Sequence, residues 1–388
     1  MSRIGIYLAS KPSDGGTFQY NKTILDALTN NNDIEVVIVC GSIEWFEYIG
    51  KNYGRHEKVL IERDFFSKLI FKLWRIVNEN LDFWYAKLAR ITDFSKKIDA
   101  QNLELLICPS QDAVPYLITI PCIGTIHDLM HRYQKKFPEV SDNGEYNKRE
   151  FHYKNICKFS KAILVDSKIG KKHVMESYGN ELVNKIFSLE FTYPQYLAET
   201  DEAVVDIEVP EKYIFYPAQF WQHKNHLNLI KAIKYLKDKN VIISLVLVGS
   251  KKNGYENVLE LIKNYNVENQ IKILGYVDDK TMKFLYKNAR ALVMPTFFGP
   301  TNIPPLEAMF LGCPVLISRL YAMPEQVEDA GLLFDPENPI DIANCIEKIW
   351  FNEELYLNLV ENGYRQIKKF SQEEFNVKFS NIIKKVLN

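Results

Sequence analysis

The sequence has no uninterrupted run of about 18 apolar residues, the minimum that a membrane-spanning helix needs. Its first residues, MSRIGIYLAS, lead directly into a strand pattern, so we expect no signal peptide. The six cysteines include no C-x-x-C pair and no zinc-type spacing with histidine, which favours reduced, buried thiols in a cytoplasmic protein. Lys and Arg number 48 and Asp and Glu 49, a balance that argues against a nucleic-acid partner.

Two ligand-binding motifs are also absent from the sequence. A G-x-G-x-x-G fingerprint, which would indicate a dinucleotide cofactor, does not occur. An Asp-x-Asp metal motif is missing as well, and the pair Asp278-Asp279 falls in an expected loop or helix start. The sequence therefore predicts neither a dinucleotide cofactor nor a metal site.

Short apolar, β-branched runs alternate with longer amphipathic segments along the 388 residues, which suffice for two domains. The expected strands are 3–8, 34–40, 104–108, 123–126, 162–166, 213–217, 242–248, 271–274, 291–294, 314–317 and 331–334. Unbroken apolar strands between helices predict parallel sheets covered on both faces, an α/β fold of doubly wound, Rossmann-like domains. We place the domains at 1–198 and 213–370, joined by the acidic stretch 199–212, with a terminal helix at 371–388.

The segment 295–318, PTFFGPTNIPPLEAMFLGCPVLIS, follows an expected strand and leads into a helix. That helix opens with two prolines, which suit a first helical turn. Ligands of open α/β sheets bind at such strand ends, where the candidate residues are Thr301, Asn302, Ile303 and Glu307. A carboxylate there can accept hydrogen bonds from two neighbouring hydroxyls, as on a ribose. The alternative is that Glu307 only complements the helix dipole.

This segment resembles the donor-site signature of the retaining GT-B glycosyltransferases of family 4, usually E-G-F-G-L-P-x-L-E-A-M-A-x-G-x-P-V. The stretch GPTNIPPLEAMFLGCPV matches it at Leu306–Met309, Gly312, Pro314 and Val315. The resemblance implies that Glu307 holds the ribose of a nucleotide donor. Gly299 replaces the first Glu of the signature, and Thr301-Asn302 replaces its Phe-Gly pair. We expect Gly299, Thr301 and Asn302 to contact the donor sugar, and Asn302 to keep a left-handed loop conformation.

A second match lies in AQFWQHKNH, after another expected strand. The family pattern there is Gly-Arg with a Lys five residues after the Arg, and Gln219 and Lys224 stand at these two positions. The resemblance implies that Lys224 faces the diphosphate, where an ammonium group stabilises the charge that develops as the sugar leaves. The alternative for Lys224 alone is a solvated lysine at a helix start. His223, His226 or Lys251 is expected to supply a cation in place of the missing Arg.

The first half of the chain carries less specific matches. Gly15-Gly16 precedes an expected helix, where it either lets the backbone approach a ligand closely or forms a plain turn. The family has a Gly-Gly loop at this place, near the donor phosphate and the acceptor. His127 ends another strand, where the family places a His against the donor sugar; a lone His there is otherwise structural. The motif HDLMHRY resembles a bacterial subgroup acting on cell-surface polysaccharides, and Arg132 within it is assigned to the acceptor.

Residues 65–97 combine seven basic and three acidic side chains with interleaved Phe and Trp. Basic, aromatic amphipathic helices bind anionic membrane surfaces. The alternative is a helix packed on the first domain. Peripheral contact with the inner face of the cell membrane through this stretch would suit a lipid-linked acceptor.

The resemblance as a whole implies a GT-B fold, with two Rossmann-like domains facing a cleft and the terminal helix crossing back to the first domain. It implies a retaining enzyme that moves a hexosyl unit, mannose by first choice, from a nucleoside diphosphate sugar to a glycan or lipid-linked acceptor in bacterial O-antigen, capsule or other surface polysaccharide synthesis. Tyr276 and Val277 are expected near the base, and catalysis is assigned to His127, Lys224 and Glu307 without metal or cofactor. The alternatives are a sugar-nucleotide epimerase and a catalytically weakened homologue that serves as a binding or scaffold subunit; the missing Glu and Arg motivate the weakened homologue.

Overall fold

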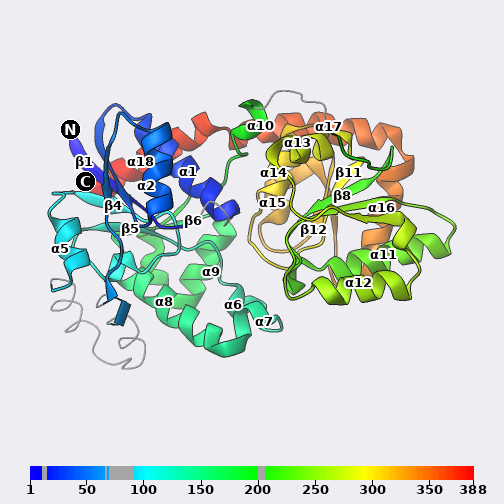
Figure 1. Ribbon diagram of the computed structural model, residues 1–388, viewed down its shortest axis with the longest axis horizontal. Helices are drawn as coiled ribbons and strands as arrows, with labels where there is room; N and C mark the ends of the chain where they lie inside the picture. The colour runs from blue at the N-terminus through cyan, green and yellow to red at the C-terminus, as the bar shows by residue number, and fades with distance from the viewer. Residues whose placement is uncertain (11–14, 66–67, 70–90, 200–205) are drawn as a thin grey trace. The chain divides into compact units, whose positions relative to one another are not determined.

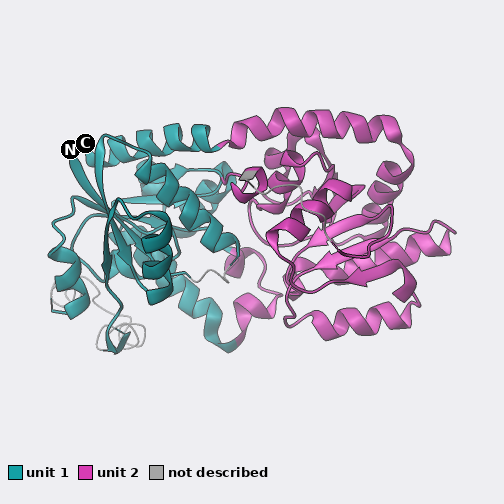
Figure 2. Ribbon diagram, turned by 45° about the horizontal axis from the view of Figure 1, so that its top comes forward, with its two compact units in different colours: residues 1–129, 143–190, 372–388 teal, residues 130–142, 191–371 magenta. Residues whose placement is uncertain are grey.

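The computed structural model describes every residue of the chain except 11–14, 66–67, 70–90 and 200–205. The described residues form two compact units, coloured separately in Figure 2. Unit 1 comprises Met1–Leu129, Asn143–Glu190 and Gln372–Asn388, and unit 2 comprises Met130–Asp142 and Phe191–Ser371.

The described part of unit 1 is built on a seven-stranded parallel sheet in the order β3-β2-β1-β4-β5-β6-β7 (Figure 1). Its strands are β1 (Ser2–Leu8), β2 (Ile34–Cys40), β3 (Glu57–Leu60), β4 (Leu105–Ile107), β5 (Cys122–Thr125), β6 (Ala162–Val165) and β7 (Ile186–Ser188). β1 and β2 pair over their whole length, from Ser2 opposite Ile34 to Leu8 opposite Cys40. The last five residues of each are buried, because helices cover both faces of the sheet and leave no side for polar residues.

The main helices of unit 1 are α1 (Gly16–Thr29), α2 (Ile43–Asn52), α5 (Asp93–Asp99), α8 (Glu145–Phe159), α9 (Lys168–Tyr178) and α18 (Gln372–Leu387). Several begin at a hydroxyl cap: Ser167 Oγ, for example, accepts the Gly170 N–H at 2.9 Å at the start of α9. The C-terminal helix α18 packs on α1, with the Phe375 ring edge-on to Tyr20 at 6.5 Å. The end of the chain thus forms part of unit 1.

The described residues of unit 2 form a six-stranded parallel sheet in the order β10-β9-β8-β11-β12-β13. Its strands are β8 (Ile214–Pro217), β9 (Leu245–Val248), β10 (Ile271–Ile273), β11 (Ala291–Met294), β12 (Val315–Ser318) and β13 (Gly331–Phe334). Its helices include α6 (Met130–Tyr133), α7 (Pro138–Ser141), α10 (Tyr196–Glu199), α11 (His226–Asp238), α12 (Tyr255–Asn264), α13 (Asp279–Asn288), α14 (Pro304–Phe310), α15 (Met323–Val327), α16 (Pro339–Phe351) and α17 (Glu353–Gln366). One continuous apolar core runs between this sheet and the helices on its two faces.

The strand order reverses once in each sheet. In unit 1 the chain moves outward from β1 to β2 and β3 and then returns to β4, on the other side of β1; in unit 2 it does the same around β8 and β11. Loops that follow the two strands flanking such a switch point leave the sheet on opposite faces and open a crevice where ligands bind. The candidate ligand-binding loops are therefore those after β8 and β11 in unit 2 and those after β1 and β4 in unit 1.

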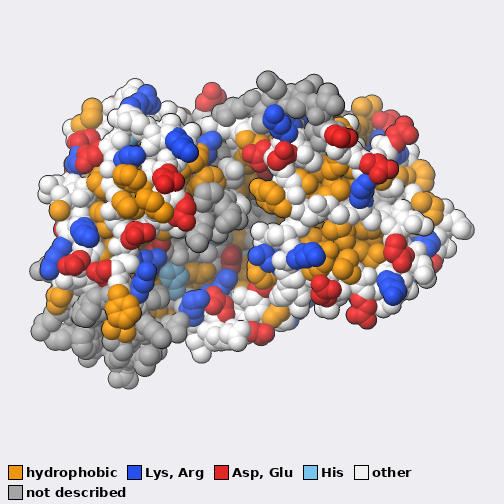
Figure 3. Space-filling model, in the orientation of Figure 1, with side chains coloured by type: hydrophobic (Ala, Val, Ile, Leu, Met, Phe, Trp, Pro, Cys, Tyr) orange, Lys and Arg blue, Asp and Glu red, His pale blue; other side chains and the backbone are white. Residues whose placement is uncertain are grey.

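Unit 2 resumes at Phe191, ahead of the acidic stretch in which the sequence analysis placed the linker. Phe191 and Tyr193 pack against the unit 2 core, and Tyr193 stacks on Phe310 with ring centroids 4.3 Å apart. The expected membrane-facing stretch 65–97 lies largely outside the described residues. Among the helices that are described, none is both long and apolar enough to span a membrane. Acidic and basic side chains are interspersed over the described surface drawn in Figure 3.

Candidate functional site

Two loops meet at the switch point of the unit 2 sheet. The β8 loop, residues 218–225, follows β8, and the β11 loop, residues 295–303, follows β11. The Phe297 N–H donates to the His223 carbonyl at 2.9 Å, and the Asn225 side-chain amide donates to the first carbonyl of the β11 loop at 2.9 Å. Asn225 is left-handed, with φ of 62°, a conformation that Asn tolerates better than most residues. The residues that the sequence singled out in the two loops therefore belong to one site.

The β8 loop carries the two positions at which the family motif has its cations. Gln219 is uncharged, and its side-chain oxygen accepts a hydrogen bond from the Trp221 indole N–H at 2.9 Å. Lys224 ends the short 3₁₀ helix η5 (Gln222–Lys224), and its carbonyl accepts a hydrogen bond from the Tyr216 hydroxyl at 2.9 Å. Tyr216 belongs to β8, so the strand itself fixes the backbone at Lys224. Of the two motif positions, Lys224 is the one that can neutralise an anion.

Gly299 and Asn302 determine the shape of the β11 loop. Gly299 has φ of 87°, and a Cβ at that position would lie 2.7 Å from the Thr301 carbonyl oxygen. The Glu that the family carries at this position therefore does not fit without a backbone shift. The Asn302 N–H donates to Gln326 Oε1 at 3.1 Å, and the Asn302 carbonyl accepts from Gln326 Nε2 at 2.5 Å. The left-handed conformation expected of Asn302 is found at Gly299 instead, because Gln326 fixes the Asn302 backbone.

Glu307 lies in α14, one turn after Ile303 at the end of the β11 loop. Each oxygen of its part-buried carboxylate accepts a hydrogen bond from a tyrosine. The Tyr286 hydroxyl of α13 donates to Oε2 at 2.6 Å, and the Tyr196 hydroxyl of α10 donates to Oε1 at 3.2 Å. The carboxylate thus receives two hydroxyl donors, one on each oxygen, which is the way it would receive two neighbouring hydroxyls of a sugar.

The charge of Glu307 depends on these surroundings. Burial raises its pKa above the ordinary value for Glu, while the hydrogen bonds from Tyr286 and Tyr196 act to lower it. Burial also raises the pKa of both tyrosines, and the nearby Glu307 carboxylate acts in the same direction. Both phenols therefore stay protonated near neutral pH and act as donors. The carboxylate is an acceptor whose ionised fraction, and so its strength, increases with pH.

Tyr276 and Val277, expected near a nucleotide base, follow β10. The Tyr276 side chain is 86% exposed, whereas Val277 is half-buried and packs against the unit 2 core. Tyr276 is close enough to Tyr196 to contribute to the raised pKa of that residue. Tyr276 thus lies near Tyr196, the residue whose hydroxyl bonds Glu307.

Unit 1 holds three further expected residues, Gly15, Gly16 and His127. Gly15 is the left-handed residue (φ 58°) before α1, which begins at Gly16, and a Cβ at Gly15 would meet no atom within 4 Å. The backbone N–H of His127 donates to the Gln111 side-chain oxygen at 3.1 Å. The His127 ring is edge-on to the ring of Tyr20 in α1, with centroids 5.1 Å apart. Burial lowers the pKa of His127 to about 4, so its imidazole is neutral near pH 7.

Residues 130–142, termed the arm, belong to unit 2, whereas the sequence analysis assigned them to the first domain. The reason is an apolar cluster that joins the arm to the β11 loop and contains Met130, Phe137, Val140, Phe297 and Phe298. Arg132, expected at the acceptor, is half-buried in α6 of the arm. The arm thus brings residues from an early part of the chain to the unit 2 switch point.

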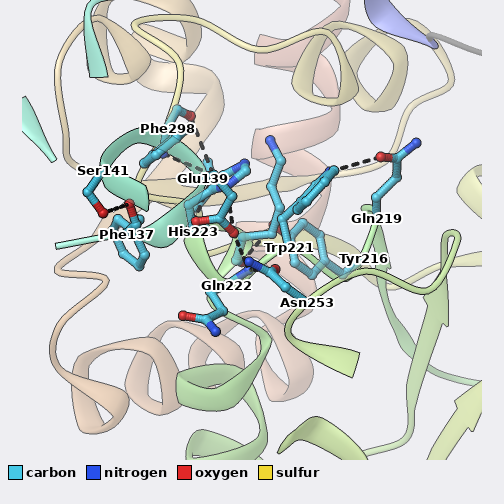
Figure 4. A network of polar contacts seen from close by, with 12 residues as sticks. Phe137, Glu139, Ser141, Tyr216, Gln219, Trp221, Gln222, His223, Asn253 and Phe298 are labelled. Atoms are coloured by element: carbon cyan, nitrogen blue, oxygen red, sulfur yellow. Dashed lines mark hydrogen bonds and ion pairs between the residues drawn. The ribbon is translucent and has the colours of Figure 1, made fainter. Parts of the chain in front are cut away.

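The arm also brings a carboxylate to the β8 loop (Figure 4). Glu139 Oε1 accepts the Gln222 N–H at 2.8 Å and lies 3.3 Å from His223 Nδ1. The same Gln222 N–H also donates to Asn253 Oδ1 at 3.1 Å, and the His223 ring stacks on Phe298 with centroids 3.9 Å apart. Burial acts to raise the pKa of Glu139, but hydrogen bonding and charge attraction to His223 outweigh it and lower this pKa to about 2. Glu139 is therefore ionised at neutral pH.

The structure separates the three residues expected to replace the missing motif cation. The His226 ring is buried, and burial lowers its pKa to about 3, so it is neutral near pH 7. Lys251 Nζ lies 4.7 Å from the centre of the Tyr255 ring. His223 Nδ1 lies 3.3 Å from Oε1 of the ionised Glu139. Of the three residues, His223 is thus the one that faces a carboxylate from within the β8 loop itself.

Tyr196, Tyr286 and Glu139 were not found by sequence reasoning. The chain contains 22 tyrosines, and tertiary contacts alone distinguish these two. Glu139 follows Pro138, a pattern that indicates a helix start and no more. Across the part of the chain that is described, no group of three or more His, Cys, Asp or Glu side chains is arranged to hold a metal ion.

The sequence and the structure are similar to those of known glycosyltransferases. Residues 198–366 match the family described as Glycosyl transferases group 1. O-antigen chain mannosyltransferase B of Escherichia coli is 25% identical over 273 residues, which cover 66% of this chain and 72% of that protein. O-antigen chain mannosyltransferase RfbU of Salmonella typhimurium is 23% identical over 353 residues, covering 90% of this chain and 89% of that protein. The crystal structure of Anabaena Alr3699/HepE in complex with UDP and glucose is similar with a TM-score of 0.73 at 14% identity, covering 99% of this chain and 100% of that one.

The matched region includes both loops of the unit 2 switch point and helix α14. The structural similarity extends over both parallel sheets, and it confirms the predicted α/β fold of two Rossmann-like domains. Residues 198–366 match the glycosyl transferases group 1 family, and the chain has the GT-B fold of glycosyltransferases.

Proposed function

We propose that the protein is a retaining glycosyltransferase that moves a hexosyl unit from a nucleoside diphosphate sugar to a glycan or lipid-linked acceptor. The observation that carries the proposal is Glu307, which accepts one tyrosine hydroxyl on each carboxylate oxygen at a topological switch point. The two vicinal hydroxyls of a ribose offer a carboxylate the same pair of donors. The Anabaena structure with the same fold contains UDP and glucose, which supports a nucleotide sugar as the donor.

Each part of the donor has a proposed partner in unit 2. Glu307 binds the ribose hydroxyls, and Tyr276 and Val277 lie near the base. Lys224 faces the diphosphate from the β8 loop. The β11 loop, through Gly299, Thr301, Asn302 and Ile303, faces the sugar. His127 of unit 1, which the family resemblance assigns to the donor sugar, is neutral at pH 7 and can exchange a hydrogen bond with a hydroxyl without placing a charge there.

The reaction breaks the bond between the sugar C1 and the diphosphate oxygen, and the electron pair passes to that oxygen. The acceptor hydroxyl forms the new bond to C1 on the same face, and its proton passes to the departing diphosphate, so atoms and charge balance. Lys224 stabilises the negative charge that grows on the diphosphate as the bond breaks. A preorganised cation of this kind acts more strongly in the transition state than in the ground state.

Mannose is the proposed sugar, and bacterial O-antigen or another surface polysaccharide is the proposed product. The names of the two relatives, both O-antigen chain mannosyltransferases, support this choice, and RfbU is similar over most of both chains. The retaining outcome is supported by the resemblance of segment 295–318 to the retaining family signature.

The test is to incubate the purified chain with uridine and guanosine diphosphate sugars and a simple alkyl mannoside, and to measure released nucleotide. We expect release to be fastest with a mannose donor, with the product keeping the anomeric configuration of the donor by NMR. The enzyme assignment would be refuted if no donor bound to the protein and no donor released nucleotide. Binding without release would instead support the alternative of a weakened homologue that serves as a binding subunit, which Gly299 and Gln219 motivate.

A further inference from the structure

The arm is anchored against both loops of the unit 2 site. Its helix α7 is a single turn, and a helix of this length has little stability of its own. Phe137, just before α7, supplies the anchor: its ring centroid is 5.1 Å from that of Phe297 and 5.4 Å from that of Phe298. Lys136 adds a cation over the Phe297 ring at 4.3 Å. This packing fixes Glu139 relative to the β8 and β11 loops.

Glu139 and His223 form a buried charge pair between the arm and the β8 loop. The Glu139 side chain is 8% exposed and the His223 side chain 11%. An ionised carboxylate at this depth is stable only when hydrogen bonds and a cation compensate its lost hydration. The Gln222 N–H and the His223 imidazole provide both. Four side chains that pack or bond around the pair are uncharged: Phe298, Phe137, Trp221 and Asn253.

The two residues that Glu139 holds directly precede Lys224. Gln222 and His223 are the first two residues of η5, and Lys224 is its last. The pair also lies at the β8 loop, whose motif position Gln219 carries no charge, and the His223 ring stacks on Phe298 of the β11 loop. Whatever fixes η5 therefore fixes the ammonium proposed to face the diphosphate, and a displacement of about 1 Å at such a group can cost about a hundredfold in rate.

We propose that Glu139 is a positioning residue for donor binding: it holds η5 through Gln222 and His223 and so sets Lys224 against the diphosphate of the nucleotide sugar. The His223 imidazole lies beside Glu139, and His223 is in the same short helix as Lys224. The proposal rests on the proposed function, because it requires a diphosphate at this loop. It assigns part of donor recognition to the arm, a segment outside the region that matches the family.

The test compares five full-length variants, one of them His223→Ala alone, with the wild type, using UDP, GDP and the nucleotide sugar that the wild type consumes. We expect Glu139→Ala to lower kcat about tenfold, because it displaces the Lys224 ammonium, and to raise the donor KM about tenfold. Nucleoside diphosphate binding should weaken equally, with the acceptor KM within about twofold. Glu139→Gln keeps an oxygen for the Gln222 N–H but loses the charge, and should fall between Glu139→Ala and the wild type. Glu139→Ala combined with His223→Ala should be no worse than the more severe single change, since the two residues act as one unit. Asp142→Asn removes an exposed carboxylate from the same arm and should match the wild type.

The outcomes separate the two proposals. If the wild type binds UDP or GDP and consumes a nucleotide sugar but Glu139→Ala keeps a donor KM within twofold, the positioning role is wrong while the proposed function stands. A fall in apparent kcat in proportion to lost folded protein by circular dichroism, with both KM values unchanged, would show a merely structural role and also overturn the inference. If the wild type neither binds nor consumes any nucleotide substrate, both proposals fail.

Discussion

Glu307 and Lys224 stand beyond the ends of two neighbouring strands of one sheet, but the chain supports them in different ways. Glu307 is held through its side chain, whose two oxygens accept the hydroxyls of Tyr286 and Tyr196. Lys224 is held through its backbone, where the Tyr216 hydroxyl bonds its carbonyl and Glu139 bonds the N–H of Gln222. The surroundings of Glu307 thus adjust its charge, whereas those of Lys224 set its position. The two residues should respond differently to substitution.

The largest effect is expected at Lys224. Lys224→Ala should lower kcat about a hundredfold, because in its proposed place the ammonium group stabilises the charge that grows on the diphosphate as it leaves. The measurement is nucleotide release at saturating donor. Lys231→Ala, which removes an exposed lysine of the following helix, is the matched control and should leave kcat unchanged. A kcat of Lys224→Ala within twofold of the wild type would contradict the assigned role.

Glu307→Ala should lower kcat/KM at least about tenfold, equivalent to about 1.4 kcal/mol. The loss should appear mainly in the donor KM, because the ribose is bound equally in the ground state and the transition state. Calorimetry with UDP and GDP would show the same loss of affinity. Unchanged nucleotide affinity in Glu307→Ala would separate this carboxylate from the ribose and leave its two tyrosines as a structural contact.

Tyr286→Phe tests how the surroundings adjust the charge of Glu307. The Tyr286 hydroxyl lowers the pKa of Glu307, which burial has raised, so its removal should raise that pKa further. In the proposed role of Glu307, donor binding needs the ionised carboxylate. Affinity should therefore fall as the pH falls through this pKa, and in Tyr286→Phe the fall should begin at a higher pH. Well above that range the affinity should stay within about threefold of the wild type.

Tyr196→Phe provides a graded comparison for the same measurement. The hydrogen bond from Tyr196 to Glu307 is 3.2 Å long, against 2.6 Å for the bond from Tyr286, so its loss should shift the pH dependence less. Nucleotide affinity measured from about pH 5 to about pH 8 would order the two variants. A shift toward lower pH in either would contradict the assigned direction.

Much of the fold follows from the sequence because apolar strand patterns are local. The expected strands 34–40 and 291–294 coincide with β2 and β11, whereas the expected 242–248 is shortened to β9 at Leu245–Val248. That strand begins late because its pairing with β8 and β10 starts at Leu245. Hydrophobicity marks an apolar run, but the neighbouring strands determine which of its residues are paired.

The residues of the site also divide into those that local sequence patterns reveal and those that depend on contacts between distant segments. Glu307 and Lys224 were found because they stand in local motifs with fixed spacing. Their partners were missed because the contacts join distant positions: Tyr286 is 21 residues from Glu307, Tyr196 is 111 residues from it, and Glu139 is 83 residues from Gln222. No periodicity marks such pairs. The placement of the arm in unit 2 was missed for the same reason, since it depends on how Phe137 packs.

The smallest effect on activity, and a measurable one on stability, is expected at Gly299, the third part of the site. Gly299→Ala should lower the free energy of unfolding by about 1–2 kcal/mol, because φ of 87° is strained for any residue with a Cβ. Gly144 of unit 1 has φ of 72° but nothing within 4 Å of a Cβ, so Gly144→Ala carries the strain without the contact. Chemical denaturation of both variants isolates the cost of the 2.7 Å approach to the Thr301 carbonyl.

Gly299→Glu extends that test to the carboxylate that the family has at this position. It should destabilise at least as much as Gly299→Ala and should not raise activity, because the β11 loop is fixed at Asn302 by Gln326 and cannot turn the new side chain toward the sugar. Equal losses in Gly299→Ala and Gly144→Ala would mean that the loop moves to admit a Cβ. If Gly299→Glu then also raised turnover, the β11 loop would be adaptable although Phe137 of the arm packs on it, whereas the hydrogen bond from the Gln222 N–H to Glu139 would hold the β8 loop.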